Sequence, residues 1–115
     1  MPLAGEVRSA SCGSRLRVGL ALDEKGAISA IGLAAQACAI GQAAAAVMAE
    51  AVIGRDLAAM QSAERDIARW LAGEGDLPSW PGLAQLAAAR DYPGRHGAFM
   101  LGWRGVLVAF APVVS

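Results

Sequence analysis

Residues that commonly reveal a function are scarce in this sequence. It contains two cysteines, Cys12 and Cys38, too few for the disulfide framework of a small secreted domain. The single histidine, His96, stands in an ordinary loop context, so no Ser/His/Asp arrangement can be built around it. No glycine-rich loop fits a phosphate-binding fingerprint, and the acidic residues are too scattered to pair for hydrolysis. These absences argue against hydrolytic and nucleotide-dependent enzymes.

Charge is equally scarce. Charged residues make up 17% of the chain, and 10 basic residues balance 10 acidic ones. A neutral chain without basic clusters lacks the electrostatic footprint of nucleic-acid binding, so we expect no such partner. Residues 26–49 carry no charge, but glycine, alanine and glutamine dilute this stretch too much for a membrane span. Residues 1–11 contain no apolar core typical of a signal peptide, so we expect a cytoplasmic protein.

Apolar residues are abundant. They form 56% of the 115 residues, and many of them are alanine. A chain of this length fits one domain with its own core. We expect residues 1–10 to be a flexible N-terminal lead and residues 11–115 to form the single domain.

Two segments have the alternating pattern of half-buried strands. Residues 15–22 alternate apolar with charged or small side chains, and residues 27–33 resume the alternation after a polar turn at residues 23–26. A slip at Ala30 and Ile31 indicates either a bulge or an ambiguous register. The sequence therefore predicts a β-hairpin.

Helical patterns follow the hairpin. The first helix is expected to begin near residues 36–41 and to end at Gly54, and the second to start at Asp56 as its N-cap. A short helix is predicted at residues 83–90, and a last helix at residues 95–109, ended before Pro112. The apolar stripe of the last helix is Phe99, Trp103, Val106, Leu107 and Phe110, and we expect the tryptophans to pack in the core or in an interface. Strands first and helices after predict an α+β domain, with a small antiparallel sheet of about three strands covered on one face by about four helices.

The two cysteines lie at element boundaries. Cys12 precedes the first strand in a loop of small residues, and Cys38 stands where the second strand passes into a helix. The N–H groups of a helix N-terminus stabilise a thiolate, so Cys38 is the more reactive candidate. The alternative is that both cysteines are small buried hydrophobic residues, which is common for cysteine.

These segments resemble motifs of the NifU/IscU/SufU-like scaffold proteins of iron–sulfur cluster assembly. Family members carry one cysteine in an Ala-Cys-Gly-Asp segment that opens a hairpin. Their second stands in a Gly-Cys segment that opens a helix of small residues ending in Lys-Gly-Lys. Residues 11–14 look like the first segment, and residues 37–43 with 53–56 look like the second. Residues 92–95 and 101–103 are similar to the C-terminal signature of the SufU-like branch, and residues 73–91 correspond to its insertion.

The family's ligand set is incomplete in this chain. The aspartate that follows the first cysteine is replaced by Ser14, and the third cysteine aligns with Ala98. The resemblance implies that Cys12 and Cys38 bind a cluster or sulfur, and it makes His96 a candidate third metal ligand. Alternatively, His96 is a solvated loop residue that binds no metal.

The missing residues restrict the chemistry that the resemblance implies. A closed zinc site or a [2Fe–2S] cluster usually has four protein ligands. Cys12, Cys38 and His96 supply three at most in one chain. A homodimer that contributes two cysteines from each subunit, or an exogenous thiol, would complete the set.

Three functions remain open. The first is a non-enzymatic scaffold or carrier that binds iron or a nascent iron–sulfur cluster, accepts sulfur from a cysteine desulfurase and serves downstream cluster acceptors. The second is a zinc-dependent sulfurtransfer protein of the SufU type. The third is a degenerate, metal-free paralogue that acts as a partner-binding module. The missing ligands weigh most heavily against the zinc protein, because its site depends on the complete set.

Overall fold

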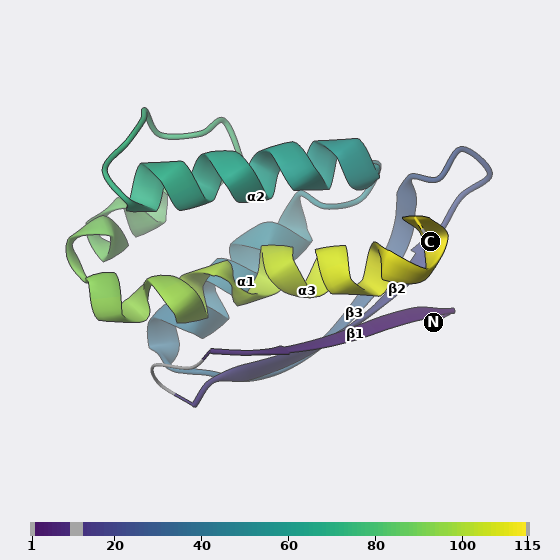
Figure 1. Cartoon of the computed structure of the whole chain (residues 1–115), viewed down its shortest axis with the longest axis horizontal. Coiled ribbons are helices and arrows are strands. Elements are labelled where there is room, and N and C mark those ends of the chain that lie inside the picture. The colour runs from purple at the N-terminus through teal and green to yellow at the C-terminus, as the bar shows by residue number, and fades with distance from the viewer. Residues whose placement is uncertain (1, 10–12, 115) are drawn as a thin grey trace.

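A computed structural model describes residues 2–9 and 13–114 (Figure 1). One antiparallel sheet has the order β1-β2-β3. Helical segments lie over one face of this sheet, so the predicted α+β architecture is confirmed. The elements, in chain order, are β1 (Leu3–Arg8), β2 (Arg15–Leu22), β3 (Ile28–Gln36), α1 (Ala39–Glu50), α2 (Leu57–Leu71), the 3-10 segments η1 (Leu83–Asp91) and η2 (Pro93–Arg95), and α3 (His96–Val114).

The hairpin of β2 and β3 forms as its pattern predicts. Leu16, Val18 and Leu20 are buried beneath the helices, while Arg15 and Arg17, which alternate with them, are exposed. Asp23 closes the turn, because its Oδ1 accepts hydrogen bonds from the N–H groups of Lys25 at 2.8 Å and Ala27 at 3.0 Å. The irregularity in the hairpin register lies slightly earlier in the chain than Ala30 and Ile31, where it was expected. The register shifts between Ala21 and Leu22 of β2, where β3 contains an extra residue, Ser29.

The expected flexible lead is wrong for residues 3–8, which form β1 and pair with β2 in antiparallel register. Leu3, Gly5 and Val7 alternate with exposed residues, so the period-two signal was present. A glycine in the middle of a short segment conceals this signal, since glycine usually weakens a strand. The reason for glycine at this position is its contact with α3.

Helix α3 forms the centre of the core. Its aromatic face is buried as predicted at Phe99, Trp103, Val106 and Phe110, whereas Leu107 of the predicted stripe is half-buried. The rings of Phe99 and Trp103 stack with centroids 6.0 Å apart, and Trp80 meets Trp103 edge-on at 5.6 Å. Of the two expected places for the tryptophans, core or interface, the structure gives the core, since Trp70, Trp80 and Trp103 are buried.

The opposite face of α3 carries small residues and approaches the sheet closely. A Cβ atom built on Gly5 of β1 would lie 2.7 Å from the backbone nitrogen of Ala109 and 2.8 Å from the carbonyl oxygen of Gly105. A Cβ atom on Gly105 would lie 2.7 Å from Cδ2 of Leu16. Figure 1 accordingly shows the end of α3 beside the beginning of β1. At Gly5 backbone meets backbone, and at Gly105 the Leu16 side chain fills the space, so neither position has room for a side chain unless its neighbours move.

One expected helix boundary is confirmed, and three expectations about the helices are wrong. Asp56 caps α2 as predicted, with Oδ1 accepting from the Ala59 N–H at 2.9 Å. Helix α1, however, ends at Glu50, because Gly54 and Arg55 turn back to exchange two 2.8 Å backbone hydrogen bonds with Ile28. The segment expected as a short helix at residues 83–90 is the 3-10 segment η1.

Helix α3 also continues past its expected end and includes Pro112, which is exposed in the last turn. No helix in the described part of the chain is long and apolar enough to cross a membrane.

We expect Gly5→Ala to lower the free energy of unfolding by about 2 kcal/mol, because the added methyl group must displace the α3 backbone. Urea unfolding followed by circular dichroism measures this loss. The control is Gly75→Ala, since a Cβ on Gly75 meets no atom within 4 Å, and its effect should stay within about 0.5 kcal/mol. Equal effects of the two substitutions would contradict the close packing of β1 on α3.

Candidate functional site

Cys38 occupies the N-cap position of α1. Its backbone is extended, with φ −63° and ψ 169°, its side chain is half-buried, and its thiol makes no capping hydrogen bond. The carbonyl oxygen of Cys38 accepts from the Gln42 N–H at 3.0 Å, and the Gln42 side chain donates to the carbonyl of Ala37 at 3.0 Å. The backbone around the cysteine is therefore held on both sides, whereas its sulfur is not used for capping.

Gln42 was not singled out by the sequence reasoning. Its position four residues after the N-cap places it one turn into the helix, where a long amide side chain can reach back to the preceding carbonyl. This four-residue spacing is the feature of the sequence that could have identified Gln42.

Ala98, the position aligned with the family's third cysteine, packs against the first turn of α1. It is fully buried, with 0% of its surface exposed. A Cβ atom built on Gly41 would lie 3.3 Å from the Cβ of Ala98 and 2.9 Å from that of Ala37. Gly41 thus allows α3 to approach α1 directly beside the turn that Cys38 begins. A longer side chain at position 98 would therefore begin next to the first turn of α1.

Cys12 lies outside the described residues. On its C-terminal side, Gly13 has a positive φ of 69° and Ser14 is 3% exposed. The register pairs Arg15 with Gln36, so β2 begins where β3 ends. Figure 1 likewise shows the start of β2 and the start of α1 at the same end of the molecule. Ser14 and Cys38 therefore flank the same end of the sheet.

His96 is attached to a different part of the molecule. Its Nε2 lies 3.1 Å from the carbonyl oxygens of both Ala89 and Arg90 in η1. Carbonyl oxygens only accept, so this nitrogen donates. His96 also lines a hollow of about 480 Å³ with the end of α2 and with Asp91 and Pro93. Because residues two apart differ by about 200° around a helix, His96 and Ala98 point to different sides of α3.

A closed metal site needs several ligands that converge on one point, and the described residues do not supply such a set. Residues 2–9 and 13–114 contain no group of three or more His, Cys, Asp or Glu side chains that could hold a metal ion. Cys38 is the described thiol, and Ser14 and Ala98 stand where the resemblance places a carboxylate and a thiolate. This donor set does not fit a resident, four-coordinate zinc ion within one chain.

Residues 73–91, where the resemblance places the insertion of the SufU-like branch, contact α1 through Trp80 and η1. The Trp80 Nε1–H donates to the carbonyl of Val47 at 3.0 Å, and Arg55 lies over the Trp80 ring at 3.9 Å from its centroid. Leu83 is fully buried. Trp80 and Leu83 thus join the core that supports α1, while residues 73–77 are exposed.

Comparison with known structures shows the same fold. The crystal structure of a nitrogen-fixing NifU-like protein (N-terminal) from Brucella abortus matches with a TM-score of 0.89 and 28% identity, over 96% of this chain and 78% of that one. A putative iron–sulfur cluster assembly scaffold protein for the SUF system from Fervidobacterium islandicum AW-1 matches with a TM-score of 0.82 and 23% identity. That match covers 93% of this chain and 79% of the other.

Sequence comparison gives the family. No curated protein sequence matches the chain significantly. The family model described as the NifU-like N terminal domain matches residues 2–97, most of the described length. The expected resemblance is therefore confirmed, and the chain belongs to the NifU-like N-terminal domain family of iron–sulfur cluster assembly scaffolds.

Proposed function

We propose that this chain acts as a non-enzymatic scaffold or carrier in iron–sulfur cluster assembly, with Cys38 as its principal sulfur- or iron-binding residue. The observation that carries the proposal is the position of Cys38 at the N-cap of α1 in a member of this family. Its thiol is half-buried and makes no capping bond, so the sulfur is not engaged by the helix that it begins. The partners we propose are a cysteine desulfurase and downstream cluster acceptors in the cytoplasm.

Sulfur transfer to Cys38 needs no metal. The Cys38 thiolate attacks the terminal sulfur of a persulfide on the desulfurase, forming a new S–S bond. The S–S bond of the donor breaks, and the desulfurase cysteine leaves as a thiolate. Oxidation states balance, because one persulfide is consumed and one is formed. The exposed side of Cys38 allows the donor to approach, while Gln42 and the α1 backbone hold the acceptor in place.

Iron or a nascent cluster is cargo in this proposal. Cys12 and Cys38 would provide two thiolates, and the remaining ligands would come from a second subunit, a partner or an exogenous thiol. His96 has a minor role, because its Nε2 would have to give up two carbonyl acceptors in η1 before it could bind iron. A cluster held by fewer protein ligands leaves more readily, which suits a carrier.

A metal-free partner-binding module is the second candidate. The observation that favours it is that Ser14 and Ala98 are buried, at 3% and 0% exposure, at positions where the family carries ligands. In that case the fold and its surfaces would be retained and metal chemistry would be absent. Metal and sulfide content separates this candidate from the carrier.

Anaerobically purified protein is expected to contain iron and acid-labile sulfide, and Cys38→Ser is expected to lose both, together with persulfide uptake from a desulfurase. His96→Ala serves as the control and should retain most of this content, since its ring contacts η1. Iron and sulfide assays with mass spectrometry of the persulfide make the measurement. Full uptake by folded Cys38→Ser protein would refute the site, and parent protein without metal or sulfide would favour the partner-binding module.

Ala98→Cys is expected to raise the affinity for Fe²⁺ or Zn²⁺ by about tenfold or more, because it adds a thiolate beside the first turn of α1. Competition with a chromogenic chelator measures this affinity. Ala98→Ser is the matched control, since it has similar size but is a poor ligand for these metals. Equal affinities of the two variants would show that position 98 does not face the site.

A further inference from the structure

The free edge of β3 is unusually unprotected. β3 is an edge strand in the order β1-β2-β3, and on its outer side Ile28 bonds to Gly54 and Arg55. From Ser29 to Gln36, the described residues provide no backbone partner on that side. Edge strands are normally blocked by charges, prolines or covering loops. Residues 29–36 contain neither charge nor proline, and the bulge at Ser29 affects only the beginning of the strand.

The face of β3 toward the helices leaves apolar surface exposed at this edge. Leu33 is 37% exposed and Ile31 is half-buried, although both are paired with buried residues of β2. Helix α3 lies mainly over β1 and β2, so it does not cover this part of β3. An incoming strand could place apolar side chains here.

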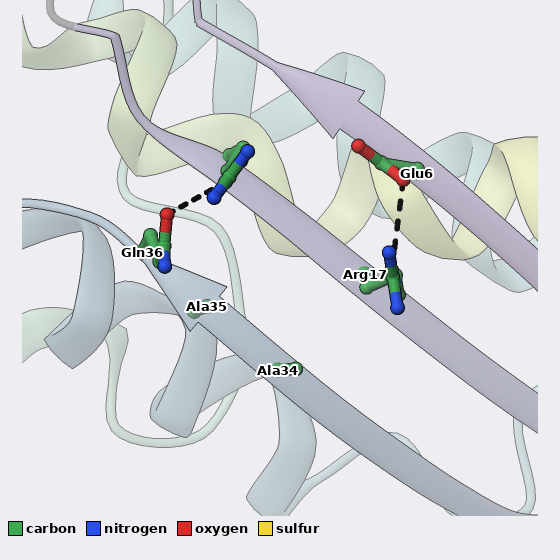
Figure 2. Close-up of a pocket in the computed structure, with 6 residues that line it drawn as sticks. Glu6, Arg17, Ala34, Ala35 and Gln36 are labelled. Carbon is green, nitrogen blue, oxygen red and sulfur yellow. Dashed lines mark hydrogen bonds and ion pairs between the residues drawn. The ribbon is translucent and has the colours of Figure 1, made fainter.

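The opposite face of the same edge is basic. Arg15 and Arg17 of β2 flank Ala34 of β3 and line a hollow of about 490 Å³ together with Gln36 (Figure 2). Gln36 accepts from Nε of Arg15 at 2.6 Å, and Glu6 lies 3.6 Å from Nε of Arg17. The Nε atom of each arginine thus faces a neighbouring side chain, and the terminal guanidinium nitrogens can bind an incoming anion.

Charge is concentrated on this face. Three arginines, Arg8, Arg15 and Arg17, are arranged around one carboxylate, Glu6, although the chain as a whole is neutral. Strand register places Arg8 opposite Arg15 and Glu6 opposite Arg17. The outer face at this end of the sheet therefore has excess positive charge next to an open strand edge.

We propose that the free edge of β3 binds an extended segment of a partner protein as a fourth strand, and that this segment alternates acidic with apolar residues. Backbone hydrogen bonds along residues 30–36 provide the pairing. Because side chains alternate across a strand, the acidic residues reach Arg15 and Arg17 on one face and the apolar ones meet Ile31 and Leu33 on the other. This proposal does not depend on the sulfur or iron chemistry of Cys38.

Two other occupants fit less well. A second copy of this chain would pair β3 with itself, and that strand has no acidic side chain to offer the arginines. Nucleic acid would find few phosphate contacts here, and none of the residues lining the hollow is an aromatic that could stack on bases.

The test uses a short fluorescein-labelled peptide of alternating glutamate and valine, with binding followed by fluorescence anisotropy at low salt. Arg15→Gln/Arg17→Gln should weaken binding by about tenfold, as expected for two exposed ion pairs. The control, Arg65→Gln/Arg69→Gln on exposed positions of α2, removes the same charge elsewhere and should change affinity less than twofold. A peptide of the same composition with glutamates and valines in separate blocks should bind several-fold more weakly.

Hydrogen exchange distinguishes strand addition from simple charge attraction. With the alternating peptide bound, amides within residues 30–36 should exchange several-fold more slowly, while those of β1 at the opposite edge stay unchanged. Equal binding of the two peptides, equal loss in both arginine variants, or no protection of β3 would overturn the proposal. So would tighter, Arg15- and Arg17-dependent binding of oligodeoxythymidine, or a dimer in sedimentation that excludes the peptide.

Discussion

The direct contact between the backbones of β1 and α3 determines how the rest of the molecule is arranged. At Gly5 of β1 a Cβ atom would overlap the α3 backbone at Gly105 and Ala109, and a Cβ atom on Gly105 would overlap the Leu16 side chain of β2. This contact places α3 over β1 and β2, which leaves its aromatic face to pack against α2 and against Trp80 in the loop before η1. It also leaves β3 at the uncovered margin of the sheet. The buried core and the open edge thus have the same cause.

The same face of α3 continues toward the candidate site. Gly102 packs on Ala45 and Met48 of α1, and Ala98 packs beside Gly41, so α3 contributes small residues along its crossing with α1. Helices can cross at short distance only where both carry such residues. Cys38 therefore begins a helix whose first turn is held by close packing, while its own side chain remains half-exposed. A rigid support with an accessible thiol is what sulfur acceptance requires.

Much of the fold could be predicted from local patterns. The β2–β3 hairpin, the Asp56 cap and the aromatic stripe of α3 each depend on a few neighbouring residues, and each is confirmed. The errors arise where a distant contact overrides the local signal. Gly5 resembles a strand breaker until α3 lies against it, and α1 ends early because Gly54 and Arg55 bond to β3.

The candidate site was less predictable than the fold, for the same reason. Cys38 stands at the strand-to-helix junction that its sequence context indicates. The direction of His96 toward η1 could not be read from its spacing, because two carbonyl acceptors from another segment determine it. The open edge of β3 was also hidden, since its sequence looks like any uncharged strand until the sheet order is known.

The close crossing of α1 and α3 has a consequence for what position 98 has to supply. The methyl group of Ala98 is fully buried and packs beside Gly41, so in this chain the position is filled by packing alone. Packing and ligand chemistry place separate demands on one residue, and here a single methyl group meets the first of them.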